Sequence, residues 1–251
     1  MLPLYDVNPT LRTPLMTFFL IGLTAAAWLF VQGAGSPLPL AISVCNFGLV
    51  PGEISGMAAL GSAVELGDGL ACVVDAESIN FLTPILSMFL HGGWGHLIGN
   101  LWFLWVFGNN VEDGMGRMRF LAFYLLTGLA AAGLHIAVAP ASIVPTVGAS
   151  GAISGVMGAY LMHHPRAPVR TWVPPIFLFN LPAWVFLIYW FVLQVLGGLP
   201  ELDQGPGEAT GGVAFWAHVG GFVAGALLAK FFDRPELLRA QEALRRRTAR
   251  N

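Results

Sequence analysis

Charged side chains are scarce in this sequence: only 10% of its 251 residues are Asp, Glu, Lys or Arg. A soluble globular domain carries about 25% charged residues. The shortage of charge and the 56% of hydrophobic residues argue against a soluble protein and indicate a protein embedded in a lipid membrane. The formal net charge of −2 gives no reason to expect nucleic acid as a partner.

Cysteine is scarce as well, since Cys45 and Cys72 are the only two. Both lie in a long segment, 34–84, that joins the first two apolar stretches and that we expect on the outer side, where oxidation is possible. The sequence leaves two alternatives open: a disulfide between them, or two unpaired small apolar side chains.

Apolar residues gather in six segments, which we predict to be helices because backbone polar groups in lipid must be satisfied within the segment. Most approach the ~20 residues needed to cross ~30 Å of hydrocarbon, but the fourth has only about 14. We read the first as an uncleaved helix rather than a secretory signal, since its apolar run continues to Val31. The segments are 13–33, 85–110, 116–138, 149–162, 181–198 and 212–232. The sequence thus predicts an all-α membrane protein, with a six-transmembrane-helix domain over 1–232 and a basic tail over 233–251.

Lysine and arginine are absent from three of the connecting segments, 34–84, 139–148 and 199–211. With alternating spans, every basic residue then falls on the opposite side, together with both termini. The positive-inside rule places that side in the cytoplasm, and the short segment before the first span suggests a prokaryotic plasma membrane. The twelve basic residues are Arg12, Arg117, Arg119, Arg166, Arg170, Lys230, Arg234, Arg239, Arg245, Arg246, Arg247 and Arg250.

Four polar side chains interrupt the apolar segments. Ser150 lies between glycines in "PTVGASGAISGVMGAY", and His218 lies in "FWAHVGGFVAGALLA". His96 and Asn100 are four residues apart and therefore share a helix face. Polar residues inside membrane spans are rare and often mark function, although a single one can be a structural hydrogen bonder.

The depths of these side chains coincide. If the sixth span starts near Gly212 and the second near Trp94, a rise of 1.5 Å per residue puts His218 and Asn100 each ~9 Å below the outer surface. The fourth segment covers only ~21 Å, so its outer end, which carries Ser150, also lies about 9 Å deep. Irregular backbone at that depth needs protein or water around it, which predicts a water-filled cavity open to the outer side.

Glycine pairs on two of these segments predict their close approach. Gly151 and Gly155 form one small-xxx-small face, and Gly221 and Gly225 form another. Such faces let helix backbones approach closely, so Ser150 and His218 should come within hydrogen-bonding reach. Helix packing alone would also explain the glycines.

Serine becomes a nucleophile when a neighbouring base accepts its proton, and His218 is a candidate base. The oxyanion formed in acyl transfer needs preorganised donors, for which His96, Asn100 and the backbone N–H of Ser150 are candidates. Because no Asp or Glu lies in the outer halves of these segments, the pattern favours a Ser–His dyad.

With these motifs the chain resembles the rhomboid intramembrane serine proteases. The resemblance covers about Phe81 to Lys230 and rests on "HGGWGHLIGN", "GASGAISG" and "AHVGGFVAG", in that order on alternate segments. It implies a six-helix core that cleaves transmembrane segments of other membrane proteins near the outer face. By motif position, Ser150 would be the nucleophile and His218 the base, while His96 and Asn100 would stabilise the oxyanion.

The resemblance also implies a structural role for Glu112. The fifth span would form a lateral gate, and the segment 199–211 would form a cap. No metal or organic cofactor is implied. The sequence departs from the family in two places. Ser154 occupies a position where some members have a tyrosine that packs against the base, so Trp216, Tyr160 or aromatic residues of the fifth span are candidates to orient His218. The long outer loop contains no Arg.

Three other functions fit parts of the sequence less well. A catalytically silent rhomboid-like protein could bind or escort membrane segments, although such relatives generally lack the serine or the histidine. A small transporter is disfavoured because paired discontinuous repeats are missing. Zinc could be held by His91, His96 and His218, but the sequence has no HExxH pattern and Ser150 would have no role.

Overall fold

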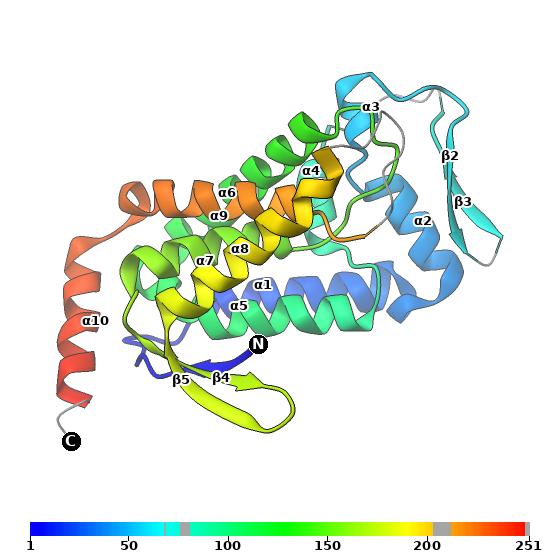
Figure 1. The fold of residues 1–251 in the computed structure, drawn as a ribbon. Coiled ribbons are helices and arrows are strands. Elements are labelled where there is room, and N and C mark those ends of the chain that lie inside the picture. Colours follow the sequence, from blue (N-terminus) through cyan, green and yellow to red (C-terminus); the bar gives the residue numbers. More distant parts are fainter. Residues whose placement is uncertain (68, 76–80, 203–211, 249–251) are drawn as a thin grey trace.

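The computed structural model describes residues 1–67, 69–75, 81–202 and 212–248, and its main body is a bundle of helices (Figure 1). Short elements, among them α2, α3, β2 and β3, lie at one end of the bundle, and α10 crosses the opposite end (Figure 1). The α-helices are α1 (Leu15–Ala26), α2 (Pro37–Phe47), α3 (Pro51–Ser55), α4 (Thr83–Leu86), α5 (Trp94–Met115), α6 (Arg117–Val138), α7 (Ser150–His163), α8 (Ala183–Leu202), α9 (Phe215–Phe232) and α10 (Pro235–Thr248).

Each of the six predicted apolar segments contains a helix. The helices α6 and α7 begin and end within a residue or two of the predicted bounds, and α7 has 14 residues. The second segment is broken: α4 and a 3₁₀ turn, Ser87–Phe89, precede α5. Among the described residues, the helices α6, α8 and α9 are long and apolar enough to cross a membrane, so the count of six spans stays a prediction.

The prediction of an all-α fold was wrong in detail, because two small antiparallel sheets are present. One has the strand order β1–β4–β5, formed by Leu2–Asp6, Pro168–Val173 and Phe177–Pro182. Val169 and Thr171 are fully buried while their neighbours are more exposed, which is the two-residue period of a strand. A six-residue alternation is too short to stand out beside 20-residue apolar runs, so the sequence predicts no strand between the fourth and fifth apolar segments.

The second sheet pairs β2 (Ala63–Gly67) with β3 (Leu70–Val73) inside the long 34–84 segment. A disulfide joins Cys45 of α2 to Cys72 of β3, which decides between the two alternatives that the sequence left open. The bond crosslinks two elements of this segment, and such a constraint stabilises the fold mainly by restricting the unfolded chain.

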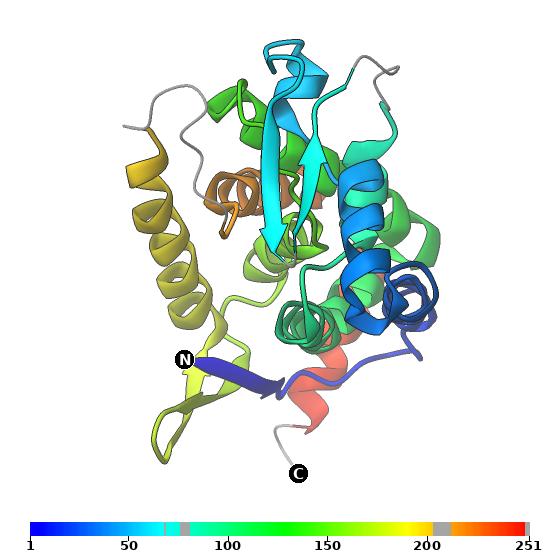
Figure 2. The ribbon, with the colours of Figure 1, turned by 90° about the vertical axis from the view of Figure 1, so that its right-hand side faces the viewer.

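The helix α7 forms the centre of the bundle, and all ten residues from Gly151 to Tyr160 are buried. The end-on view in Figure 2 shows the other helices arranged around this core. The packing of α7 against α9 brings the two backbones into contact. A Cβ atom on Gly221 would collide with the carbonyl of Gly151, and one on Gly225 would collide with the carbonyl of Gly155. The close approach predicted from the glycine pairs is therefore confirmed.

A buried carboxylate ties α1 to α5. Glu112 is 2% exposed, and its oxygens accept hydrogen bonds from the backbone N–H groups of Met16 (3.1 Å) and Thr17 (2.7 Å) and from the Thr17 hydroxyl (2.8 Å). These donors satisfy a carboxylate that would otherwise be costly to bury. The contacts fit the structural role that the family resemblance implies for Glu112.

We expect Gly225→Leu to lower stability strongly, because the added side chain meets the backbone of Gly155, which cannot rotate away. Overpacking typically costs about 1–3 kcal/mol, and this substitution should lie at the upper end of that range. Thermal unfolding in detergent, followed by circular dichroism, measures the effect. Gly133→Leu on α6 is the matched control, since nothing lies within 4 Å of its added Cβ; equal melting temperatures for the two variants would contradict the prediction.

Candidate active site

Ser150 is the first residue of α7, and the turn before it depends on glycine. Gly148 has a φ of 134°, a backbone conformation that residues other than glycine rarely adopt. A Cβ atom there would also lie 2.8 Å from ring atoms of His96. The Gly148 N–H donates to the carbonyl of Ser87 (2.9 Å), which anchors the turn. The glycine thus lets the start of α7 approach the His96 ring.

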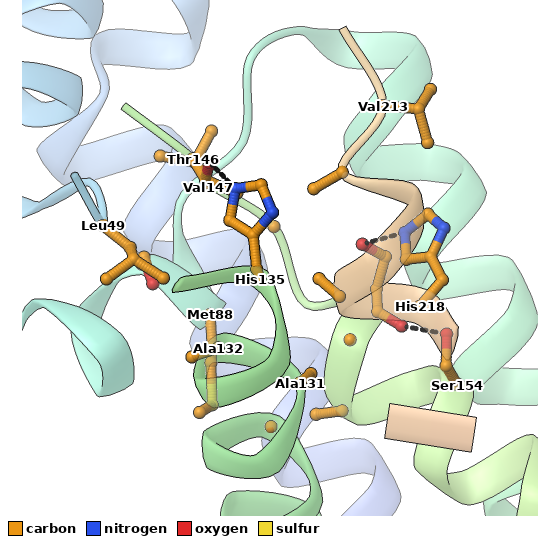
Figure 3. A pocket seen from close by; sticks show the side chains of 18 of the residues that line it. Leu49, Met88, Ala131, Ala132, His135, Thr146, Val147, Ser154, Val213 and His218 are labelled. Atoms are coloured by element: carbon orange, nitrogen blue, oxygen red, sulfur yellow. Dashed lines mark hydrogen bonds between the residues drawn. The ribbon is translucent and has the colours of Figure 1, made fainter. Parts of the chain in front are cut away.

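The hydroxyl of Ser150 faces the base predicted from the sequence. The Oγ atom of Ser150 lies 2.7 Å from Nε2 of His218. The His218 side chain, which α9 contributes, is labelled in Figure 3. This contact follows from the tight packing of α7 and α9, since both residues lie one turn or less from the Gly151–Gly221 contact. The predicted hydrogen bond between Ser150 and His218 is therefore present.

The other ring nitrogen of His218 has a partner that the sequence analysis missed. Nδ1 of His218 lies 2.8 Å from Oε1 of Gln194, a residue of α8 that is 9% exposed. The Trp190 ring, also from α8, lies 5.8 Å from the imidazole at 37°. Gln194 is the single amide in the apolar run "AWVFLIYWFVLQVLGG", and that isolation was the available signal.

The residues proposed from sequence to orient His218 divide into two groups. Among the aromatic residues of the fifth segment, Trp190 is the one whose ring lies beside His218. Trp216 instead donates its ring N–H to the carbonyl of Gly198 (2.9 Å), and Tyr160 donates its hydroxyl to Asp6 (2.6 Å). Ser154 donates to the carbonyl of Ser150 (2.6 Å), one turn back on the same helix (Figure 3).

Two further side chains could stabilise negative charge. Asn100 is 7% exposed, and its Nδ2 atom has no hydrogen-bond partner among the described residues. A buried donor without a partner costs free energy, so this amide group is available to a ligand. The His96 ring lies 5.0 Å from the His91 ring, and its Nδ1 accepts a 3.4 Å hydrogen bond from the Gly92 N–H.

A cavity of about 800 Å³ brings these groups together. Ser150, His218, His96 and Asn100 all line it, and so does His135, whose Nε2 lies 3.0 Å from the Thr146 hydroxyl (Figure 3). Segments 138–148 and 212–214 contribute to its wall, so the cavity lies at the end of the bundle where the segments without basic residues meet. Whether that end faces the outer side of a membrane stays a prediction.

The three-histidine zinc site finds no support in the described part of the chain, where no three His, Cys, Asp or Glu side chains lie close enough to hold a metal. His218 has both ring nitrogens engaged, by Ser150 and by Gln194. His91 is completely buried, and its backbone N–H and carbonyl are held by the side-chain amide of Gln32 at 2.8 Å each. The arrangement is therefore suited to proton transfer from a hydroxyl rather than to metal binding.

Comparison with known proteins gives one consistent result. The family model described as Rhomboid domain matches residues 78–234. The protein named RHOMBOID-like protein 5 of Arabidopsis thaliana is 32% identical over 145 residues, covering 57% of this chain and 41% of the relative. The protein named Rhomboid protease GluP of Bacillus subtilis is 29% identical over 164 residues, covering 65% of this chain and 28% of the relative.

The chain spans less than half the length of these relatives. Another relative, RHOMBOID-like protein 6, mitochondrial, of Arabidopsis thaliana, is 29% identical over 147 residues, covering 57% of this chain and 41% of the relative. Relatives named for an organelle leave the predicted prokaryotic plasma membrane and the side of the termini without support.

Proposed function

The chain belongs to the rhomboid family, and from that premise we propose that it is a serine endopeptidase that cleaves transmembrane segments of other membrane proteins. The observation that carries the proposal is the 2.7 Å contact between Ser150 Oγ and His218 Nε2 inside a cavity. A hydroxyl hydrogen-bonded to an imidazole is the arrangement that activates serine for acyl transfer.

In the proposed reaction, Ser150 Oγ attacks the carbonyl carbon of the scissile peptide bond while His218 Nε2 accepts the hydroxyl proton. The carbonyl oxygen becomes an oxyanion. When the tetrahedral intermediate collapses, the C–N bond breaks and His218 gives the proton to the leaving amine. Water then attacks the acyl-enzyme with His218 again as base, which releases the new carboxylate and restores the Ser150 hydroxyl.

The oxyanion would be held by three donors. The Ser150 backbone N–H lies in the first turn of α7, where backbone donors have no partner within the helix, and the helix dipole favours negative charge there. The unpartnered amide of Asn100 and the ring of His96 complete the set. Preorganised donors of this kind are typically the largest single contribution to such catalysis.

The substrate would be a membrane protein in a lipid bilayer whose helix unwinds near the cavity, since a helical peptide bond is shielded from attack. The cavity lies at the end of the bundle without basic residues, so the positive-inside rule supports cleavage near the outer face with both termini in the cytoplasm. The 199–211 cap predicted from sequence falls mostly on residues 203–211, outside the described residues.

Reconstitution in liposomes with a reporter that contains one transmembrane helix tests the proposal. We expect a single cleavage within or beside the reporter helix, seen by mass spectrometry of the two products. Stable binding of the reporter without cleavage would overturn the protease assignment and favour the alternative of a catalytically silent escort protein.

We expect Asn100→Ala to lower kcat about 10²-fold to 10³-fold, the usual cost of removing one oxyanion donor. KM should change little, because the donor acts on charge that forms only in the transition state. Steady-state cleavage of the reporter measures both constants. Asn180→Ala, which removes an amide of β5 that accepts from Arg170 on the surface, is the control; a change confined to KM in Asn100→Ala would contradict the role.

A further inference from the structure

The helix α8 contributes one polar group to the candidate active site, the side-chain amide of Gln194. It is nearly buried, and both ends of the amide have partners. This inference rests on the proposed function, in which His218 must accept a proton from Ser150. Before that step, one nitrogen of the imidazole must carry the hydrogen and the other must be free to accept.

The amide of Gln194 has one orientation that satisfies its neighbours. Its Nε2 atom lies 3.3 Å from the backbone carbonyl oxygen of Trp190, which can only accept a hydrogen bond. The NH₂ end must therefore face Trp190, because the reverse orientation would bring two acceptors together. The carbonyl oxygen Oε1 then faces Nδ1 of His218 at 2.8 Å.

This orientation determines the tautomer of the base. An amide oxygen cannot donate, so Nδ1 of His218 must carry the hydrogen and donate it to Gln194. A neutral imidazole has a single N–H, which leaves Nε2 as an acceptor for the Ser150 hydroxyl 2.7 Å away. A chain of three hydrogen bonds thus runs from Ser150 through His218 and Gln194 to the backbone of α8.

We propose that Gln194 is a positioning residue that holds His218 with its hydrogen on Nδ1 and its lone pair on Nε2 directed at Ser150. In serine proteases with a third member, a carboxylate holds the tautomer and stabilises the imidazolium. A neutral amide oxygen performs the first task fully and the second only through its dipole. The site is in this sense a Ser–His–Gln arrangement, although the sequence predicts a dyad.

The neighbouring contacts explain why the acceptor is well placed. The Trp190 ring covers one side of the imidazole, and the rings of Trp190 and Phe191 pack against Phe222 of α9 at 6.1 Å and 4.8 Å. The Trp216 N–H also binds the Gly198 carbonyl of α8. These contacts hold α8 against α9 on both sides of Gln194.

Two substitutions distinguish the role of Gln194 as a hydrogen-bond acceptor from its role in packing. Gln194→Met keeps a side chain of similar length but offers no oxygen to Nδ1. Gln194→Glu keeps the acceptor for Nδ1, and its other oxygen must carry a proton to keep the bond to the Trp190 carbonyl. We expect Gln194→Met to lower kcat and the rate of Ser150 labelling by a fluorophosphonate about 10-fold to 100-fold. This is less than the ~10⁴-fold cost of losing a correctly placed acidic partner. KM should stay within about twofold, since the acceptor does not touch substrate.

The Glu variant decides between positioning and simple packing. Recovery of kcat and labelling in Gln194→Glu, with loss in Gln194→Met, supports the proposal. Full activity in Gln194→Met, or equal loss in both variants, overturns it. An inactive parent protein would instead reject the proposed function, and the two failures are thereby distinguished.

A readout independent of turnover is ¹⁵N NMR of histidine-labelled protein in detergent, with the His218 signals assigned by their loss in His218→Asn. We expect a single Nδ1–H tautomer for His218 in the parent and a mixture of tautomers in Gln194→Met. An Nε2–H tautomer in the parent would overturn the proposal even if the protein were active.

Discussion

Ser150→Ala should abolish cleavage of the transmembrane reporter. The substitution removes the only atom of this residue that can attack the peptide carbonyl, while the backbone N–H and the turn at Gly148 stay in place. Without a covalent step, only the donors and the binding cavity remain to accelerate hydrolysis, so the loss should exceed ~10³-fold. The assay is product formation in liposomes over several hours, at saturating reporter.

Ser154→Ala is the matched control for this prediction. It removes a hydroxyl one turn further along α7, which donates to the Ser150 carbonyl and is 1% exposed. Side-chain hydroxyl bonds to the carbonyl four residues back contribute little to helix stability, so this variant should cleave within about tenfold of the parent. Cleavage by Ser150→Ala at the parent rate would reject the nucleophile assignment outright.

The second large effect is expected for His218→Ala. Without the imidazole, Ser150 loses its proposed proton acceptor, and the hydroxyl is a weak nucleophile at neutral pH. Where nucleophile and base act as one unit, removing either costs about as much as removing both. The double variant Ser150→Ala/His218→Ala should therefore be no slower than either single variant.

His135→Ala is the control for the loss of a cavity histidine. His135 lines the same cavity, but it binds Thr146 rather than Ser150. We expect this variant to retain cleavage within about tenfold of the parent, because the imidazole that it removes has no contact with the proposed nucleophile.

Independent, additive effects of Ser150→Ala and His218→Ala would contradict a shared proton-transfer step.

The Ser150–His218 contact could be predicted because it depends on local patterns. The glycine pairs predict two helix faces lined by small residues. The length of the fourth segment predicts that Ser150 lies below the outer membrane surface. The structure has a 14-residue α7 that begins at Ser150 and packs on α9 through backbone contacts. These features need only helical periodicity and the spacing of small residues.

Gln194 could not be predicted in the same way. The run that forms α8 is apolar on every side, so its periodicity does not reveal which face meets α9. The small sheets escaped for a different reason. Strand β1 pairs with β4 across more than 160 residues, and pairing over such a distance leaves no local signal. The disulfide likewise depends on how α2 and β3 approach each other in space.

The most direct test of the central claim is site-resolved labelling by a fluorophosphonate, which reacts only with an activated serine. We predict that the probe modifies Ser150 alone in the parent protein in lipid, and that the modification disappears in His218→Ala while the fold is retained. Undiminished labelling of Ser150 in His218→Ala, or labelling of a different serine in the parent, would contradict the account.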